Sequence, residues 1–162
     1  MSVACADVVT VSSHSAMIGD TCSAEWLCDQ LRNSSTAAVN HTVDVGRPAV
    51  LVLDCRSADD YSAAHVVGSL PVVVPSILLR RLRNGSANVA AVVSDPSSRS
   101  LFTDCCRTSH IVLYDAAGAS GDAVGSGYLG SGGCDSVVQV LMSRLKKDGC
   151  RVSYLLGTCC VL

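Results

Sequence analysis

The chain is 162 residues long, 49% of its residues are hydrophobic and 16% are charged, and its formal net charge is −2 at pH 7. This length and hydrophobic content suit one domain with a sizeable core, whereas the weak negative charge argues against a nucleic-acid binder. No stretch reaches the roughly 18 apolar residues that a membrane span needs, and residues 1–23 lack the features of a secretory signal. We therefore expect a cytoplasmic chain that binds neither nucleic acid nor membrane.

The first part of the chain predicts one helix and one buried strand. Residues 1–23 are small, polar and without periodicity, so we expect a disordered tail. A helix is predicted at 24–32, where apolar residues share one face and Ser23 can cap the start. A loop is expected at 33–47. The unbroken apolar run at 49–53 predicts a strand that is buried on both faces, as in parallel sheets.

The rest of the chain alternates between strand and helix signals. Further elements are predicted as strands at 70–74, 111–114 and 152–156 and as helices at 58–65, 75–85, 96–106 and 136–147. Because strands alternate with helices, we expect an α/β fold with a small parallel sheet flanked by helices. The Gly/Ser-rich segment at 116–133 is expected to be a mobile loop.

The sequence contains ten cysteines, which resemble a disulfide framework at first sight. A chain this long and hydrophobic does not need such a framework. No two cysteines stand in a CxxC arrangement, so neither a metal site nor a cofactor site is expected. We expect reduced cysteines that act mainly as small buried hydrophobes.

The segment that begins at Asp54-Cys55-Arg56 follows the first long strand. A strand ending in Asp-x-Arg, an acidic-aromatic turn and a His-Val-x-Gly-Ser sequence resemble the first signature of the rhodanese fold. The polar pair could belong to a catalytic site or could build the turn between two strands. We favour the second interpretation, in which Asp54 and Arg56 satisfy each other's polar groups.

No catalytic residue is predicted. In rhodanese-like enzymes the nucleophilic cysteine follows a later strand, and the matching position here is Asp115. A carboxylate cannot accept a sulfur atom and repels an anion. The protein phosphatase signature, His-Cys followed by five residues and Arg, is also absent, because none of the four histidines precedes a cysteine.

The segment 77–83, Ile-Leu-Leu-Arg-Arg-Leu-Arg, is the strongest candidate for a binding site. On a helix its leucines gather on one side while Arg80 and Arg83 project from the other, with Arg81 at a flank. The leucines can therefore anchor the helix while the guanidinium groups pair with carboxylates of a partner. The alternative is an ordinary solvated helix face.

Together these segments are similar to the N-terminal domain of mitogen-activated protein kinase phosphatases, in the cytoplasmic subgroup selective for extracellular-signal-regulated kinases. The resemblance begins at Ala24-Glu25-Trp26-Leu27 and includes Val52–Arg56. It continues through Pro75–Gly85, which matches the family's kinase interaction motif almost unbroken. It extends to Val112–Asp115 and to Leu145–Cys150.

The resemblance implies a catalytically inactive rhodanese-like domain over 24–157 that docks a kinase of the extracellular-signal-regulated class. It also implies a regulatory role in a dual-specificity phosphatase that inactivates mitogen-activated protein kinase signalling. The implied partner is the acidic docking patch of that kinase, and the implied partner-binding residues are Leu79, Arg80, Arg81, Leu82 and Arg83.

The sequence departs from the family at its C-terminal end. A short tail at 158–162 stands where the family has a helix that covers the sheet, so we expect that helix to be missing and the chain to be truncated before a catalytic domain. Two alternatives stay open. One is a small thiosulfate sulfurtransferase that uses Cys134 or Cys106, and the other is a non-functional truncation product.

Overall fold

The computed structural model describes residues 17–18, 20–36, 47–116 and 136–157. The strands are β1 (Met17–Ile18), β2 (Thr21–Ser23), β3 (Val50–Asp54), β4 (Leu70–Pro71), β5 (His110–Tyr114) and β6 (Arg151–Leu156). The helices are α1 (Ala24–Thr36), α2 (Ala58–Ala63), α3 (Ser76–Arg83), α4 (Pro96–Cys105) and α5 (Val137–Lys147), with a short 3-10 helix, η2, at Val89–Val92. The predicted α/β alternation is confirmed.

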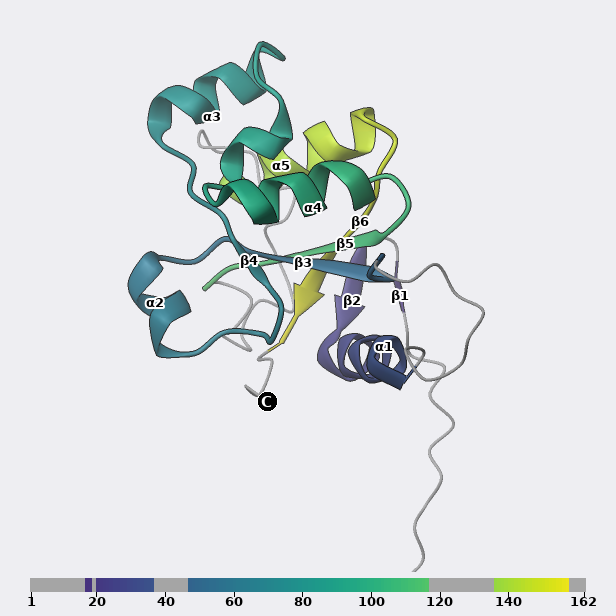
Figure 1. The fold of residues 1–162 in the computed structure, drawn as a ribbon. Helices are drawn as coiled ribbons and strands as arrows, with labels where there is room; N and C mark the ends of the chain where they lie inside the picture. The colour runs from purple at the N-terminus through teal and green to yellow at the C-terminus, as the bar shows by residue number, and fades with distance from the viewer. Residues whose placement is uncertain (1–16, 19, 37–46, 117–135, 158–162) are drawn as a thin grey trace, which may run out of the picture.

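The six strands form one sheet in the order β1-β2-β6-β5-β3-β4. Neighbouring strands are parallel except β1 and β2, which pair antiparallel. Helices α3, α4 and α5 cover one face of the sheet, and α1 covers the other (Figure 1). This three-layer arrangement buries both faces of the central strands, as the apolar run of β3 predicts.

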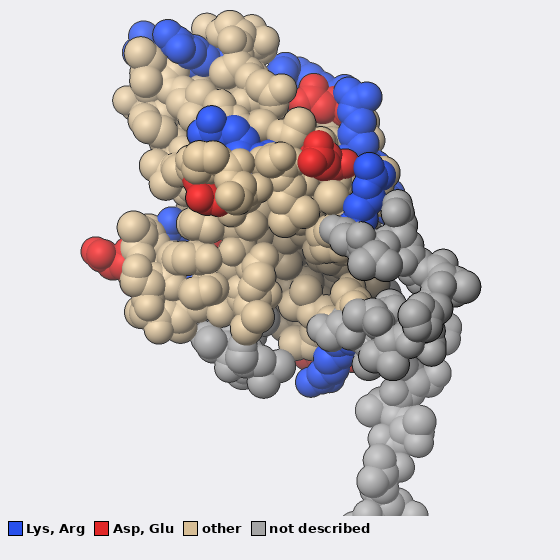
Figure 2. Space-filling view, viewed as in Figure 1, with Lys and Arg blue, Asp and Glu red and all other residues tan. Residues whose placement is uncertain are grey.

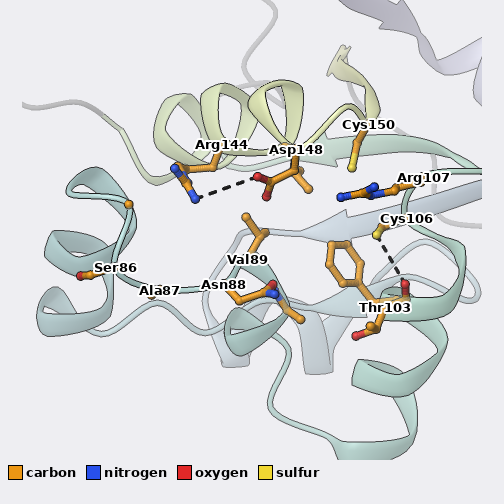
Figure 3. Close-up of a pocket in the computed structure, with 14 residues that line it drawn as sticks. Ser86, Ala87, Asn88, Val89, Thr103, Cys106, Arg107, Arg144, Asp148 and Cys150 are labelled. Carbon is orange, nitrogen blue, oxygen red and sulfur yellow. Dashed lines mark hydrogen bonds and ion pairs between the residues drawn. The ribbon is translucent and has the colours of Figure 1, made fainter.

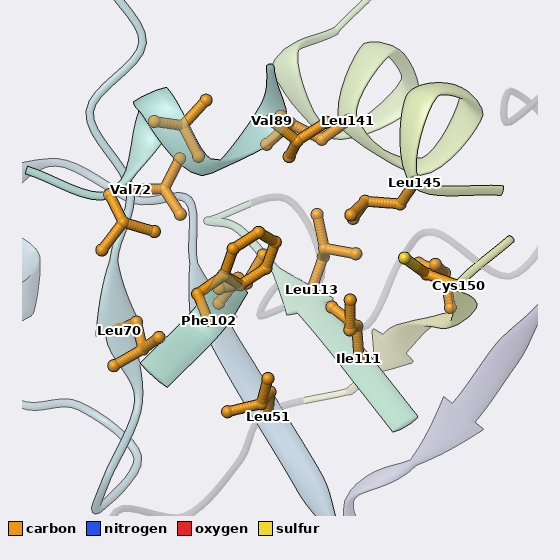
Figure 4. Packing of buried hydrophobic residues seen from close by; sticks show 14 of the residues in the cluster. Leu51, Leu70, Val72, Val89, Phe102, Ile111, Leu113, Leu141, Leu145 and Cys150 are labelled. Carbon is orange, nitrogen blue, oxygen red and sulfur yellow. The ribbon is translucent and has the colours of Figure 1, made fainter. Parts of the chain in front are cut away.

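The two cores follow from the alternation of side chains along each strand. Leu51 and Leu53 of β3 face the larger core, beneath α3, α4 and α5, whereas Val50 and Val52 face the smaller core beneath α1. The larger core is closed by helix residues that pack over the strands (Figure 4), among them Leu82, Phe102, Leu141 and Leu145. Helix α3 is therefore attached to the centre of the domain.

The sheet begins earlier in the chain than the sequence predicts. Thr21–Ser23 pairs with β6, with Thr21 opposite Tyr154, so these residues belong to the fold and not to a disordered tail. Three residues are too short for alternation to identify a strand. The strand forms because the edge of β6 offers backbone hydrogen-bond partners. Residues 1–16 lie outside the described part of the chain.

Some boundaries also differ from prediction. Helix α1 continues to Thr36, four residues beyond its predicted end, because no Gly or Pro interrupts it. The strand predicted at 70–74 covers only Leu70–Pro71, because it lies at the sheet edge and proline cannot donate to a ladder. Beyond it, Val72 forms an isolated antiparallel bridge with Val93.

Several expectations fall on residues outside the described ranges. These are most of the predicted loop at 33–47, nearly all of the mobile loop at 116–133, and the tail at 158–162 together with the missing helix. In the ranges that are described, no helix is both long enough and apolar enough to cross a membrane.

Candidate docking surface

Helix α3 turns its leucines toward the core, as the helical spacing predicts. Leu82 is 0% exposed, and Leu78 and Leu79 are partly buried against the same cluster. The expectation that leucines anchor the helix is therefore confirmed. In this structure the Leu82 side chain is fully buried and holds the helix in position, and its contact with a partner stays a prediction.

The end of α3 is defined by a glycine-terminated Schellman motif. The N–H of Gly85 donates to the carbonyl of Leu82 at 3.1 Å, and the N–H of Ser86 donates to that of Arg81 at 2.9 Å. Gly85 has φ +75°, a conformation that costs glycine little but strains other residues. The motif ends the helix directly after the basic segment and fixes the backbone conformation that follows its last turn.

The outer face of α3 is basic. Arg80, Arg81 and Arg83 are all exposed and lie in the last turn, where positive charge complements the helix dipole. Within the described residues, neither Arg80 nor Arg81 forms an ion pair. Figure 2 shows Lys and Arg side chains at the α3 end of the molecule, at the upper left of the view, and others along its right-hand side.

An apolar side chain flanks this basic face. Ile77, in the first turn of α3, is 60% exposed. The helical period places Ile77 beside Arg81, one turn further along the helix. The exposed face thus combines positive charge with one apolar side chain.

The Asp54–Arg56 pair is a structural network at the carboxyl end of β3. Arg56 donates Nε to Asp54 Oδ1 at 3.0 Å and Nη2 to Asp54 Oδ2 at 2.7 Å, and its Nη2 also donates to the carbonyl of Ala64 at 2.6 Å. The hydroxyl of Tyr114 donates to the same carboxylate. Burial alone would raise the pKa of Asp54, but these hydrogen bonds outweigh it and hold the pKa below its usual value. The predicted mutual satisfaction of Asp54 and Arg56 is confirmed.

Asp115 is the residue that the sequence resemblance places at the cysteine position of rhodanese-like enzymes. Asp115 follows β5 directly, and its Oδ1 accepts a hydrogen bond from the hydroxyl of Tyr154 at 2.6 Å. The nearby thiol is that of Cys55, whose pKa is raised by burial and by the negative charges of Asp115 and Asp54. A protonated thiol is a poor nucleophile, so this edge of the sheet does not resemble a sulfur-transfer site.

The described cysteines are free thiols, namely Cys22, Cys28, Cys55, Cys105, Cys106 and Cys150. Three of these six thiols are buried and the other three are partly exposed. Cys106 is partly exposed, whereas Cys134 lies outside the described residues. Across the described ranges, no three His, Cys, Asp or Glu side chains converge to hold a metal ion.

A polar cavity of about 490 Å³ opens between the end of α3, η2 and the C-terminal ends of α4 and α5. Arg144 and Asp148 enter it from α5, and Arg107 enters it from the turn after α4 (Figure 3). Sequence reasoning missed this site, because its residues come from segments that are distant in the chain. No local spacing signal marks it.

The fold agrees with comparisons to known proteins. The rhodanese-like domain family matches residues 37–142. This span is well over half of the chain, and the chain therefore belongs to the rhodanese-like domain family.

Individual relatives are more specific. The chain is 33% identical over 139 residues to dual specificity protein phosphatase Mpk3 of Drosophila melanogaster, covering 84% of this chain and 31% of that protein. It is 32% identical over 125 residues to human dual specificity protein phosphatase 6, covering 77% of this chain and 31% of the relative. It is 28% identical over 135 residues to human dual specificity protein phosphatase 7, covering 83% of this chain and 28% of that relative. The chain spans less than a third of the length of these relatives.

Proposed function

We propose that this domain docks a mitogen-activated protein kinase of the extracellular-signal-regulated class through the exposed face of α3. Arg80 and Arg81 meet acidic side chains of the kinase, and Arg83 and Leu79 extend the contact. The domain acts as the regulatory half of a dual-specificity phosphatase that inactivates this signalling in the cytoplasm. The observation that carries the proposal is the exposure of two arginines, without an ion pair among the described residues, on a helix that the core holds in place.

Arginine on a rigid helix suits recognition of a folded acidic surface. Its planar guanidinium pairs with carboxylates through two parallel hydrogen bonds. Because Leu82 is buried and Gly85 ends the helix, the last turn of α3 is already ordered before a partner arrives. Preorganisation of this kind lowers the entropic cost of binding.

The chemistry at the sheet edge supports binding over catalysis. The sequence resemblance places Asp115 at the position of the rhodanese nucleophile, and burial, together with the negative charges of Asp115 and Asp54, opposes formation of the Cys55 thiolate. The phosphatase signature is absent from the sequence. The contribution to dephosphorylation that we propose is therefore recruitment of the kinase, and not the bond-breaking step.

Charge reversal at the docking helix tests the proposal. Isothermal titration of a purified extracellular-signal-regulated kinase compares the parent chain with Arg80→Glu/Arg81→Glu, and Arg32→Glu on α1 is the matched control. We expect the double variant to abolish binding and the control to leave it unchanged. Each single alanine variant costs about 2 kcal/mol or more if these arginines are hot spots. Binding also weakens as salt is raised, because the contact is partly Coulombic.

Retained binding by the charge-reversed variant, with its fold verified by circular dichroism, would contradict the proposal. Thiocyanate production from thiosulfate and cyanide, lost in Cys106→Ser or Cys134→Ser, would instead support the sulfurtransferase alternative. A parent chain without a cooperative unfolding transition would support the non-functional fragment.

A further inference from the structure

The cavity between α3, α4 and α5 is continuous with the docking helix. Ser86 lines the cavity, and its N–H and hydroxyl both donate to the carbonyl of Arg81, at 2.9 and 3.3 Å. On the other side, Arg144 Nη1 lies 3.3 Å from the point where a Cβ on Gly85 would stand. The cavity therefore begins where the basic helix ends. A partner seated on the last turn of α3 lies at its mouth.

Arginine side chains in this cavity have unused hydrogen-bonding capacity. The Nε of Arg144 is buried and has no hydrogen-bond partner within the described part of the chain. Its Nη2 lies 4.0 Å from Asp148 Oδ1, which is a long ion pair. Arg107 is exposed and forms no ion pair with any described residue. A buried charged donor without an acceptor is unfavourable, so the positive charge of Arg144 is poorly compensated. Its side chain as a whole is 21% exposed, so a carboxylate in the cavity can approach the guanidinium group and compensate that charge.

We propose that this cavity is a second carboxylate subsite, in which Arg144 and Arg107 receive an acidic side chain of the kinase that docks on α3. The inference rests on the proposed function. Ser86, Asn88 and Thr103 also line the cavity, but each of their side chains already forms a hydrogen bond with a backbone group. The groups that suit a carboxylate are therefore the two guanidinium groups, which enter the cavity from α5 and from the turn after α4 (Figure 3). The carboxylate of Asp148 is the one negative group among the lining residues, so it competes with the ligand for Arg144.

Because Asp148 and the ligand compete for Arg144, two substitutions in the cavity are expected to change the kinase dissociation constant in opposite directions. Arg107→Gln removes a ligand-binding charge, and we expect the kinase dissociation constant to rise about threefold to fivefold. Asp148→Asn removes the internal competitor and is expected to lower the dissociation constant about twofold to threefold. Both side chains reach the surface, so neither substitution disturbs the core. A residue with only a structural role does not tighten binding when it is replaced.

The control variants make the same two types of substitution, Arg to Gln and Asp to Asn, on the opposite face of the sheet. Arg32→Gln and Asp29→Asn lie on α1, where the two side chains form an exposed 3.7 Å pair. Isothermal titration of the purified kinase at two salt concentrations is expected to give unchanged dissociation constants for both. If these controls change affinity as much as the cavity variants do, the effect is general electrostatics and the subsite is rejected.

The outcomes separate this inference from the docking proposal. If charge reversal at Arg80 and Arg81 abolishes binding while Arg107→Gln and Asp148→Asn leave the dissociation constant unchanged, docking holds and the subsite is rejected. If Asp148→Asn weakens binding, the subsite is also rejected. If the parent chain does not bind the kinase, both proposals are rejected together.

Discussion

Arg56 forms a two-pronged pair with Asp54, with Nε to Oδ1 at 3.0 Å and Nη2 to Oδ2 at 2.7 Å. The Asp54 side chain is 0% exposed and that of Arg56 is 18% exposed, so water contributes little to either charge. Because the Nη2 of Arg56 also donates to the carbonyl of Ala64, the pair joins β3 to the segment after α2. These residues hold the sheet edge together.

Removal of Arg56 is predicted to be strongly destabilising. Arg56→Met leaves the buried carboxylate of Asp54 without its cationic partner, and we expect a loss of about 3–5 kcal/mol in the free energy of unfolding. Arg32→Met breaks the exposed pair with Asp29 and is expected to cost less than about 1 kcal/mol. Urea unfolding of both variants measures the difference. Equal losses would show that the Asp54–Arg56 pair is not structural.

Substitutions of two apolar residues of α3 are predicted to have different effects, one on the stability of the domain and the other on kinase binding. Leu82→Ala creates a cavity in the core and is expected to lower the free energy of unfolding by about 2–5 kcal/mol. Ile77→Ala changes that free energy by less than about 0.5 kcal/mol, because the side chain is exposed, but weakens kinase binding. Thermal unfolding and titration calorimetry on the same samples measure both effects. A destabilised Ile77→Ala variant with full affinity would contradict this division.

Acid is predicted to destabilise the domain through His110. Burial, together with the positive charge of Arg151, holds the pKa of His110 below its usual value, and the ring lies against Trp26 and within 2.9 Å of Ser153 Oγ. The unfolded chain then binds more protons than the folded chain as pH falls below about 6.5, so stability falls. Free energies of unfolding at pH 7.5 and 5.5 measure this loss.

The matched variant for this prediction is His110→Gln, which has no titrating ring. We expect its stability to fall less between the two pH values than that of the parent chain. Asp54 does not contribute to the change in stability between pH 7.5 and 5.5. Its pKa is lowered in the folded chain, and such a carboxyl affects stability only below about pH 4. An equal pH dependence in parent and variant would exclude His110 as the cause.

Two buried thiols are predicted to be unreactive in the folded chain. Burial raises the pKa of Cys22 to about 12, and burial followed by the charge of Cys106 raises that of Cys150 to about 11. At pH 7.5 their thiolate fractions are on the order of one in a thousand or less. Iodoacetamide labelling followed by peptide mass spectrometry is expected to modify Cys28, which is partly exposed, before either of them. Labelling of all three at one rate before urea is added would contradict the prediction.

Local patterns predicted most of the fold. The continuous apolar run of β3 indicates a strand with two buried faces, and the amphipathic spacing of α3 and α5 indicates which face of each packs inward. Ser136, which forms a capping box with Gln139, begins α5 where the sequence predicts it. These signals are short-range, because helix and strand periods are set by the backbone geometry of a few successive residues.

The same local patterns could not predict that β2 exists or where β4 ends. Both depend on a neighbouring strand that is distant in the chain: Thr21 pairs with Tyr154, and Leu70 pairs with Leu53. A strand of two or three residues has no period to detect. Its existence follows from the hydrogen bonds that an adjacent edge makes available.

The amino-acid order alone determined the class of fold and the basic helix around residues 77–83, since each follows from patterns in consecutive residues. Tertiary packing decided that Arg144 of α5 meets Gly85 at the end of α3 beside a cavity. That contact joins segments about sixty residues apart, and only the packing of both helices on the same face of the sheet brings such segments together.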